Sequence, residues 1–138
     1  MLYNIYMGSQ TYFNERNLKN EQKIREQLTF LPAFCEDFFI GIENNTSALT
    51  RLNYTYDLRL FFDYMFNETN VFAGKNTNTL QVRDLNNITS KTIERFISYI
   101  GNYTGSDGKT YTNGEDGKAR KIATLRSFLK YFFKRGLI

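Results

Sequence analysis

The chain has 138 residues, of which 41% are hydrophobic and 17% aromatic, and its formal net charge is +4. This length suits one compact domain, and the apolar content excludes a chain that is disordered throughout. The lack of histidine excludes histidine-based catalytic triads, and the single cysteine, Cys35, excludes an intramolecular disulfide and a cysteine-based metal site. No apolar stretch approaches the roughly 20 residues of a membrane-spanning helix, so we expect no membrane association.

The N-terminal third predicts an arm, a charged helix and a first core helix. Residues 1–13 show no clear period, which predicts a loose arm. Residues 14–28 have a helical, charged pattern with a thin apolar stripe, which predicts a helix that docks on the body or stays detached. Pro32 suits the first turn of a helix over residues 31–43. The expected buried face of that helix is Phe34, Phe38 and Ile42.

The middle of the chain predicts two more core helices. The first runs over about residues 50–66, with Thr50 or Ser47 as its N-cap. Its expected buried side is Tyr54, Leu58, Phe61, Phe62 and Met65. Residues 67–87 predict a long connection to a helix capped by Thr89 or Ser90. The expected buried face of this helix is Ile93, Phe96, Ile97 and Ile100.

The C-terminal part predicts a glycine-rich loop followed by a basic helix. Five glycines over residues 101–117 predict a flexible loop or a short hairpin. The helix is predicted to start at Asn113 or Lys118 and to end at Lys134, with Gly136 as its stop. Its expected core stripe is Ile122, Leu125, Phe128, Leu129, Phe132 and Phe133. Its expected opposite face is Arg120, Thr124, Ser127, Lys130, Tyr131 and Lys134. No strong strand pattern occurs, so the predicted fold class is all-α.

The positive charge is concentrated in the last 21 residues. Residues 118–138 hold seven lysines and arginines and no acidic residue, whereas the rest of the chain holds 11 against 14 acidic residues. A basic element on a slightly acidic body favours a polyanionic partner, although a solvated helix face is the simpler alternative. Duplex DNA fits such a helix, because cations neutralise phosphates and the major groove accepts one α-helix. A helical adaptor that binds another protein is the alternative function.

Four segments resemble, in order, one known domain. "TRLNYTYDLRLFF" fits the pattern Thr-x-x-x-Tyr-x-x-Asp-Leu-x-x-Phe, and "RKIATLRSFLKYFFKRGLI" is similar to the last helix of that domain. "LPAFCEDFF" and "ITSKTIERFISYI" fit its first and third helices. Together they resemble the N-terminal, SAM-like core-binding domain of tyrosine recombinases, the phage-integrase and Xer-like site-specific recombinases, over residues 30–138.

The resemblance implies a four-helix core-binding domain over residues 30–138, preceded by an arm and an additional helix over residues 1–29. In the family a catalytic domain with a tyrosine nucleophile follows a short linker. Because this chain lacks histidine and ends where the linker would begin, we expect a fragment that is not an enzyme and needs no metal or cofactor. The implied partners are double-stranded DNA and the missing catalytic domain. We expect a monomer alone, a parent protein that oligomerises on DNA, and a place in the bacterial cytoplasm at the nucleoid.

In the family, the second and fourth helices of the core face DNA. By position, the residues implied to contact DNA are Arg51, Asn53, Tyr56 and Arg59 on one helix, and Lys118, Arg120, Lys121, Thr124 and Ser127 on the other. Arg126 also matches the family but lies near the apolar stripe, so it is expected to brace the fold. Asp57 is expected to be a local helix or loop partner rather than a catalytic carboxylate. The loop over residues 101–117 could reach a phosphate backbone.

Overall fold

The structure is a computed structural model that describes residues 2–138, with side chains described from residue 14 onward. The α-helices over this range are α1 (Leu2–Leu28), α2 (Cys35–Ile42), α3 (Ala48–Glu68), α4 (Ser90–Ile100) and α5 (Glu115–Lys134). Two 3-10 segments, η1 (Glu43–Asn45) and η2 (Val82–Asn87), and two strands, β1 (Asn102–Thr104) and β2 (Thr110–Thr112), accompany them. The chain is therefore mostly helical, as the sequence predicts.

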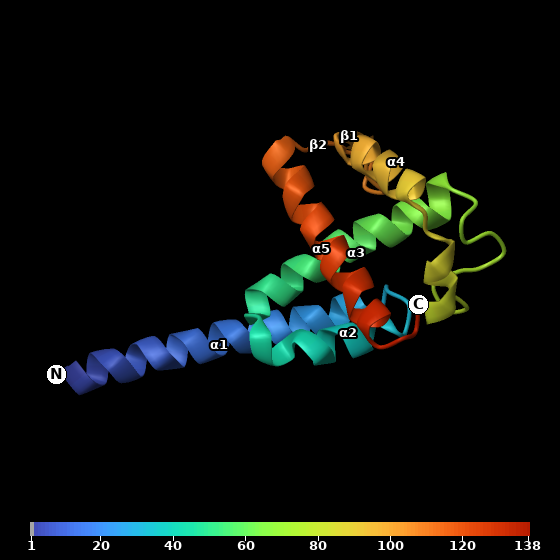
Figure 1. The fold of residues 1–138 in the computed structure, drawn as a ribbon. Coiled ribbons are helices and arrows are strands. Elements are labelled where there is room, and N and C mark those ends of the chain that lie inside the picture. Colours follow the sequence, from blue (N-terminus) through green and yellow to red (C-terminus); the bar gives the residue numbers. More distant parts are fainter. Residues whose placement is uncertain (1) are drawn as a thin grey trace.

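Helix α1 is longer than predicted. Its backbone is helical from Leu2, so the prediction of a loose arm over residues 1–13 is wrong for residues 2–13, and residue 1 lies outside the described residues. This segment contains no proline, and extending an existing helix costs far less than nucleating a new one. Figure 1 shows the N-terminal half of α1 running out beyond the other helices.

Local backbone chemistry sets the ends of the other helices. Helix α2 begins only at Cys35, whose N–H donates to the carbonyl of Pro32 at 3.0 Å, so the proline precedes the helix by a turn. The side chain of Ser47 caps α3 by accepting from the N–H of Thr50 at 3.1 Å. Thr89 caps α4 in the same way, accepting from the N–H of Thr92 at 3.2 Å. These two N-caps are among the alternatives predicted.

Helix α5 ends as predicted at Lys134. Gly136 has φ +70°, a conformation that glycine adopts without strain. The N–H of Gly136 donates to the carbonyl of Phe133 at 3.0 Å, and the N–H of Leu137 donates to that of Phe132 at 3.1 Å. This pair of bonds is the Schellman motif, which satisfies carbonyls left over at a helix end.

Phenylalanine rings from four helices meet in the core. The fully buried rings are Phe38, Phe61, Phe62, Phe96, Phe128 and Phe132. Edge-to-face pairs link α2 to α5 (Phe38 and Phe128, 5.2 Å) and α3 to α4 (Phe61 and Phe96, 5.1 Å). One predicted core residue is misplaced: Phe133 is 70% exposed. Phe133 follows Phe128 by five residues, about 140° around the helix, which turns it away from the core.

The two connections are ordered against the bundle. In the stretch from Thr69 to Ile88, Phe72, Leu80 and Leu85 are buried. The glycine-rich segment forms an antiparallel hairpin in which Tyr103 faces Tyr111, with ring centroids 5.4 Å apart. Of the two predicted alternatives for this segment, the hairpin is the one that forms.

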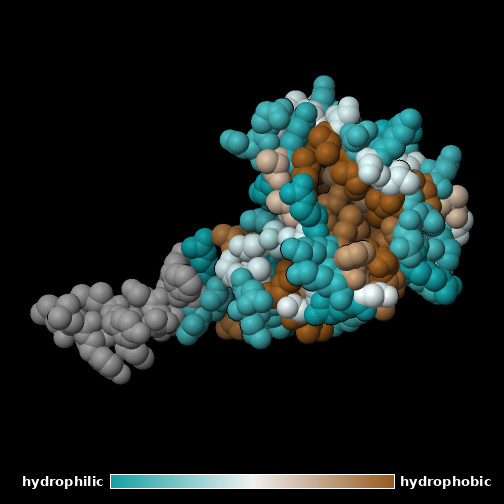
Figure 2. All heavy atoms as spheres, viewed as in Figure 1, coloured by the Kyte–Doolittle hydropathy of each residue, from teal (hydrophilic) through white to brown (hydrophobic). Residues whose placement is uncertain are grey.

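One face of the molecule carries a hydrophobic band. Figure 2 shows the band between α5 and α4. The partly exposed aliphatic residues of these two helices are Ile93, Ile97, Ile122 and Leu129. Among the residues described, no helix is both long enough and apolar enough to cross a membrane.

Candidate nucleic-acid interface

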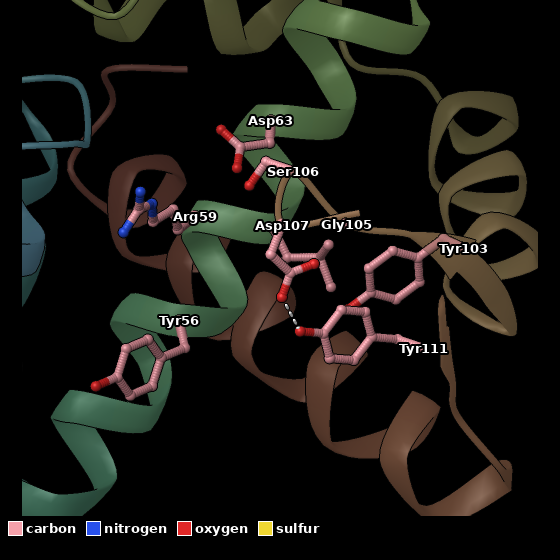
Figure 3. Close-up of a pocket in the computed structure, with 9 residues that line it drawn as sticks. Tyr56, Arg59, Asp63, Tyr103, Gly105, Ser106, Asp107 and Tyr111 are labelled. Carbon is pink, nitrogen blue, oxygen red and sulfur yellow. Dashed lines mark hydrogen bonds between the residues drawn. The ribbon is translucent and has the colours of Figure 1, made fainter. Parts of the chain in front are cut away.

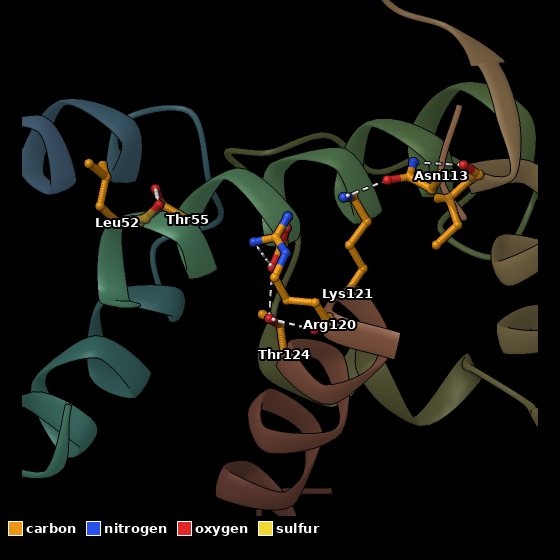
Figure 4. A network of polar contacts seen from close by, with 8 residues as sticks. Leu52, Thr55, Asn113, Arg120, Lys121 and Thr124 are labelled. Atoms are coloured by element: carbon orange, nitrogen blue, oxygen red, sulfur yellow. Dashed lines mark hydrogen bonds and ion pairs between the residues drawn. The ribbon is translucent and has the colours of Figure 1, made fainter. Parts of the chain in front are cut away.

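Helices α3 and α5 cross, and an ionic cluster of Asp57, Arg120 and Thr124 locks the crossing (Figures 1 and 4). The carboxylate of Asp57, on α3, accepts from Nη2 of Arg120 at 3.0 Å and from Nη1 at 3.3 Å. It also accepts from the hydroxyl of Thr124 at 2.8 Å. Asp57 thus joins two helices far apart in sequence, so the prediction of a local partner is wrong.

The cluster is buried on one side and open on the other. The side chain of Asp57 is only 3% exposed, whereas that of Arg120 is 50% exposed. Burial raises the pKa of Asp57 above its ordinary value, and the hydrogen bond from Thr124 and the charge of Arg120 work against that rise. Arg120 therefore has a structural partner and still presents part of its guanidinium to solvent. Thr124 is fully buried, so the prediction that it lies on the exposed face is wrong.

Arg51 lies on the side of α3 that faces α1. It is 7% exposed, and its Nη1 donates to Oε1 of Glu21 at 2.6 Å. The expectation that Arg51 lies on an open face is therefore wrong. Arg51 is buried because α1 covers this side of α3. The sequence left open whether α1 docks on the body or stays detached.

The outer face of α3 carries the other three predicted residues. Asn53, Tyr56, Leu60 and Asp63 follow a spacing of three or four residues, so they form one stripe on the side turned away from the core. Tyr56 is 46% exposed. Arg59 lies at the α1 edge of this stripe, where it donates to Oε1 of Gln27 at 3.1 Å and stacks over the ring of Phe30 at 4.0 Å.

Two predicted lysines of α5 turn toward the hairpin. Nζ of Lys121 donates to Oδ1 of Asn113 at 3.1 Å, and its pKa is lowered mainly by burial and then by the charge of Arg120. Lys118 lies against Gly101: a Cβ placed on this glycine would be 3.1 Å from Cε of Lys118. Of the five residues predicted on α5, only Arg120 and Ser127 are exposed.

The exposed flank of α5 continues beyond the predicted residues. Arg120, Ser127 and Lys134 repeat every seven residues, so they share one flank, and Lys130 lies next to it. The regular spacing of basic residues along α5 is the sequence signal that identifies Lys130 and Lys134 as part of this flank. Arg126 is exposed one turn before Lys130 and has no ion-pair or hydrogen-bond partner among residues 14–138, so the expectation that it braces the fold is wrong.

A shallow cleft between α3 and the hairpin adds residues that the sequence did not indicate. Its volume is about 290 Å³, and Tyr56, Arg59 and Asp63 line it from α3. Tyr103, Asp107 and Tyr111 line it from the hairpin side (Figure 3). The hydroxyl of Tyr111 donates to Asp107 and lowers the pKa of that carboxyl. The cleft mixes acidic and basic groups, so it adds no phosphate site.

The described residues contain no cluster of three or more acidic or cysteine side chains that could hold a metal ion. No protein-family model matches the chain, and neither does any curated protein or solved structure. The surface formed by Asn53 and Tyr56 on α3, with Arg120, Ser127, Lys130 and Lys134 on α5, is called the α3–α5 surface below.

Proposed function

We propose that this chain is a DNA-binding module of the core-binding, SAM-like type found in tyrosine recombinases, and that it grips one face of a duplex through the α3–α5 surface. The observation that carries the proposal is the cluster of Asp57, Arg120 and Thr124. This cluster fixes the crossing of α3 and α5, the two helices with which this type of module contacts DNA. It leaves Arg120 half exposed, and Lys130 and Lys134 are exposed further along α5.

The chemistry of the surface suits a phosphate backbone. Lys130 and Lys134 are exposed and have no ion-pair partner within the described part of the chain, so they are available to displace counterions from DNA. The amide of Asn53 and the hydroxyls of Tyr56 and Ser127 supply groups that contact phosphates or base edges. In this proposal the strand-breaking chemistry belongs to a separate catalytic domain, and this chain contributes binding alone, without cofactor or metal.

Two lysines of α5 give the sharpest test of this surface. In the double variant Lys130→Gln/Lys134→Gln, we expect affinity for a fluorescein-labelled duplex to fall about tenfold or more near 0.1 M salt, since two phosphates are no longer neutralised. Fluorescence anisotropy titration measures the affinity. Charge reversal at Arg120 is a poor choice, because it would place a second carboxylate beside buried Asp57.

The matched control removes the same charge elsewhere. Arg83 and Lys91 are exposed on η2 and α4, and Arg83→Gln/Lys91→Gln should weaken binding by less than half as much on a logarithmic scale. Equal reductions in affinity in the two variants would show that net charge alone drives binding and would reject the surface.

The hydrophobic band favours a second candidate, the protein-interaction adaptor. Beyond the band itself, Phe133 is 70% exposed and Leu137 48% exposed at the end of α5. Contiguous exposed apolar surface is typical of protein interaction sites. An adaptor would show no DNA binding, and its associations would change little with salt.

A further inference from the structure

Helix α1 is fixed to α3 in a defined rotation. Ile24, at 4% exposure, is the centre of its contact side. On one side of Ile24, Glu21 pairs with Arg51 at 2.6 Å. On the other side, Gln27 accepts from Arg59 at 3.1 Å. Together these interactions fix the rotation of α1 about its own axis, and therefore the directions in which the neighbouring side chains of α1 point.

The two flanks of α1 face different neighbours. Glu21, Arg25 and Leu28 line a cleft together with residues of α2, so this flank faces α2. Gln27 and Phe30 contact Arg59, which lies at the edge of the outer stripe of α3. The second flank of α1 therefore borders the α3–α5 surface.

Three cations lie on this second flank. Arg16, Lys23 and Gln27 are spaced by seven and four residues and share one side of α1, and Lys19 lies beside them at the outer edge of this flank. All three cations are exposed, and none has an ion-pair partner among the residues whose side chains are described. Glu26 follows Lys19 by seven residues and Glu15 precedes it by four, so both carboxylates border Lys19 at the outer edge of this flank.

We infer that Arg16, Lys19 and Lys23, the α1 stripe, are a second track of phosphate-binding side chains that extends the DNA interface across α3 to the side opposite α5. This inference rests on the proposed function. From Arg16 to Lys23 the helix rises about 10 Å. That rise matches roughly three nucleotide steps of one DNA strand. Arg59, which contacts Gln27 on the flank that carries Arg16 and Lys23, links this flank to the outer face of α3.

The salt dependence of binding tests the α1 stripe. The probe is a mixed-sequence duplex of about 30 base pairs, titrated with the full chain at several salt concentrations. In the triple variant Arg16→Gln/Lys19→Gln/Lys23→Gln, the log–log slope of affinity against salt should become shallower by about 0.9 for each phosphate that is no longer neutralised. For two or three such phosphates, the expected change in slope is about 2 to 3.

A control variant carries the same change in net charge. Arg25 lies on the α2-facing flank of α1, and Arg83 and Lys91 lie on η2 and α4. Arg25→Gln/Arg83→Gln/Lys91→Gln should leave the slope within about 0.5 of the wild-type value, which is less than the effect of a single phosphate. Circular dichroism checks that both variants keep their helix content.

The outcomes separate this inference from the proposed function. A shallower slope in the stripe variant alone supports the α1 track. The same slope in both triple variants overturns it, and the proposed function survives if Lys130→Gln/Lys134→Gln still weakens binding. A wild-type chain that does not bind the duplex rejects both.

Discussion

At the scale of single residues, Arg120 combines a structural role with a position on the proposed interface. Its guanidinium pairs with the carboxylate of Asp57, and its charge works against the rise in the pKa of Asp57 that burial causes. Half of its side chain is still exposed. A weaker affinity for DNA in any Arg120 variant would therefore mix two effects, and stability must be measured beside affinity.

The structural role predicts a pH-dependent effect. Arg120→Ala leaves Asp57 buried with only the Thr124 hydroxyl as partner, which should lower the free energy of unfolding by about 1–3 kcal/mol at pH 7. The pKa of Asp57 is already raised, and removing Arg120 raises it further, so Asp57 takes up a proton as the pH falls. The destabilisation should accordingly be smaller at pH 4 than at pH 7, as measured by urea unfolding.

Lys130→Ala serves as the control for that measurement, because Lys130 is exposed on the same helix. It should change the free energy of unfolding by less than about 0.5 kcal/mol at either pH. If Arg120→Ala cost as much at pH 4 as at pH 7, its effect could not arise from an unpaired Asp57 carboxylate.

At the scale of elements, the ion pair between Arg51 and Glu21 contributes to the docking of α1, together with buried Ile24 and the bond from Arg59 to Gln27. Arg51 is 7% exposed, its Nη1 pairs with Glu21, and its Nε has no hydrogen-bond partner among the described residues. Glu21→Ala would leave the buried guanidinium without its counterion. We expect the free energy of unfolding to fall by about 1–3 kcal/mol. Hydrogen exchange should also become faster in the docked half of α1 than in the wild type.

Glu26→Ala is the matched change on the same helix, since Glu26 is exposed on the back of α1. It should leave both measurements nearly unchanged. If Glu21→Ala behaved like Glu26→Ala, the pair with Arg51 would not be what holds α1 in place.

The helices could be predicted from local signals, but the way they pack together could not. Apolar spacing predicted most of the buried side of α3, but on α4 only Phe96 and Ile100 of the predicted face are buried, and Ile93 and Ile97 are partly exposed. Capping chemistry predicted Ser47 and Thr89, each as one of two alternatives, and Gly136. The partner of Arg51 could not be predicted, because Glu21 lies 30 residues away on a helix with only a thin apolar stripe. The pairing of Asp57 with Thr124 spans 67 residues and depends on how α3 crosses α5. Arg51 and Thr124 were therefore expected on the surface although both are buried, whereas Tyr56 and Ser127 are exposed and Asn53 is partly exposed.

At the scale of the whole molecule, one surface crosses three helices. The α1 stripe lies at one edge, the outer face of α3 in the middle, and the flank of α5 at the other edge. The acidic groups of the hairpin cleft, Asp63 and Asp107, lie toward one end of the α3 stripe. They should exclude phosphates there, so we expect DNA to lie nearer Asn53 than Asp63.

The central claim is that the chain binds duplex DNA electrostatically, and the salt dependence of that binding tests it most directly. We would titrate a labelled duplex with the wild-type chain between about 50 and 200 mM salt. Neutralisation of about six or more phosphates predicts a log–log slope of about −5 or steeper and an affinity that falls by about a thousandfold. An absence of binding at the lowest salt, or an affinity that does not change with salt, would contradict the claim and favour the adaptor.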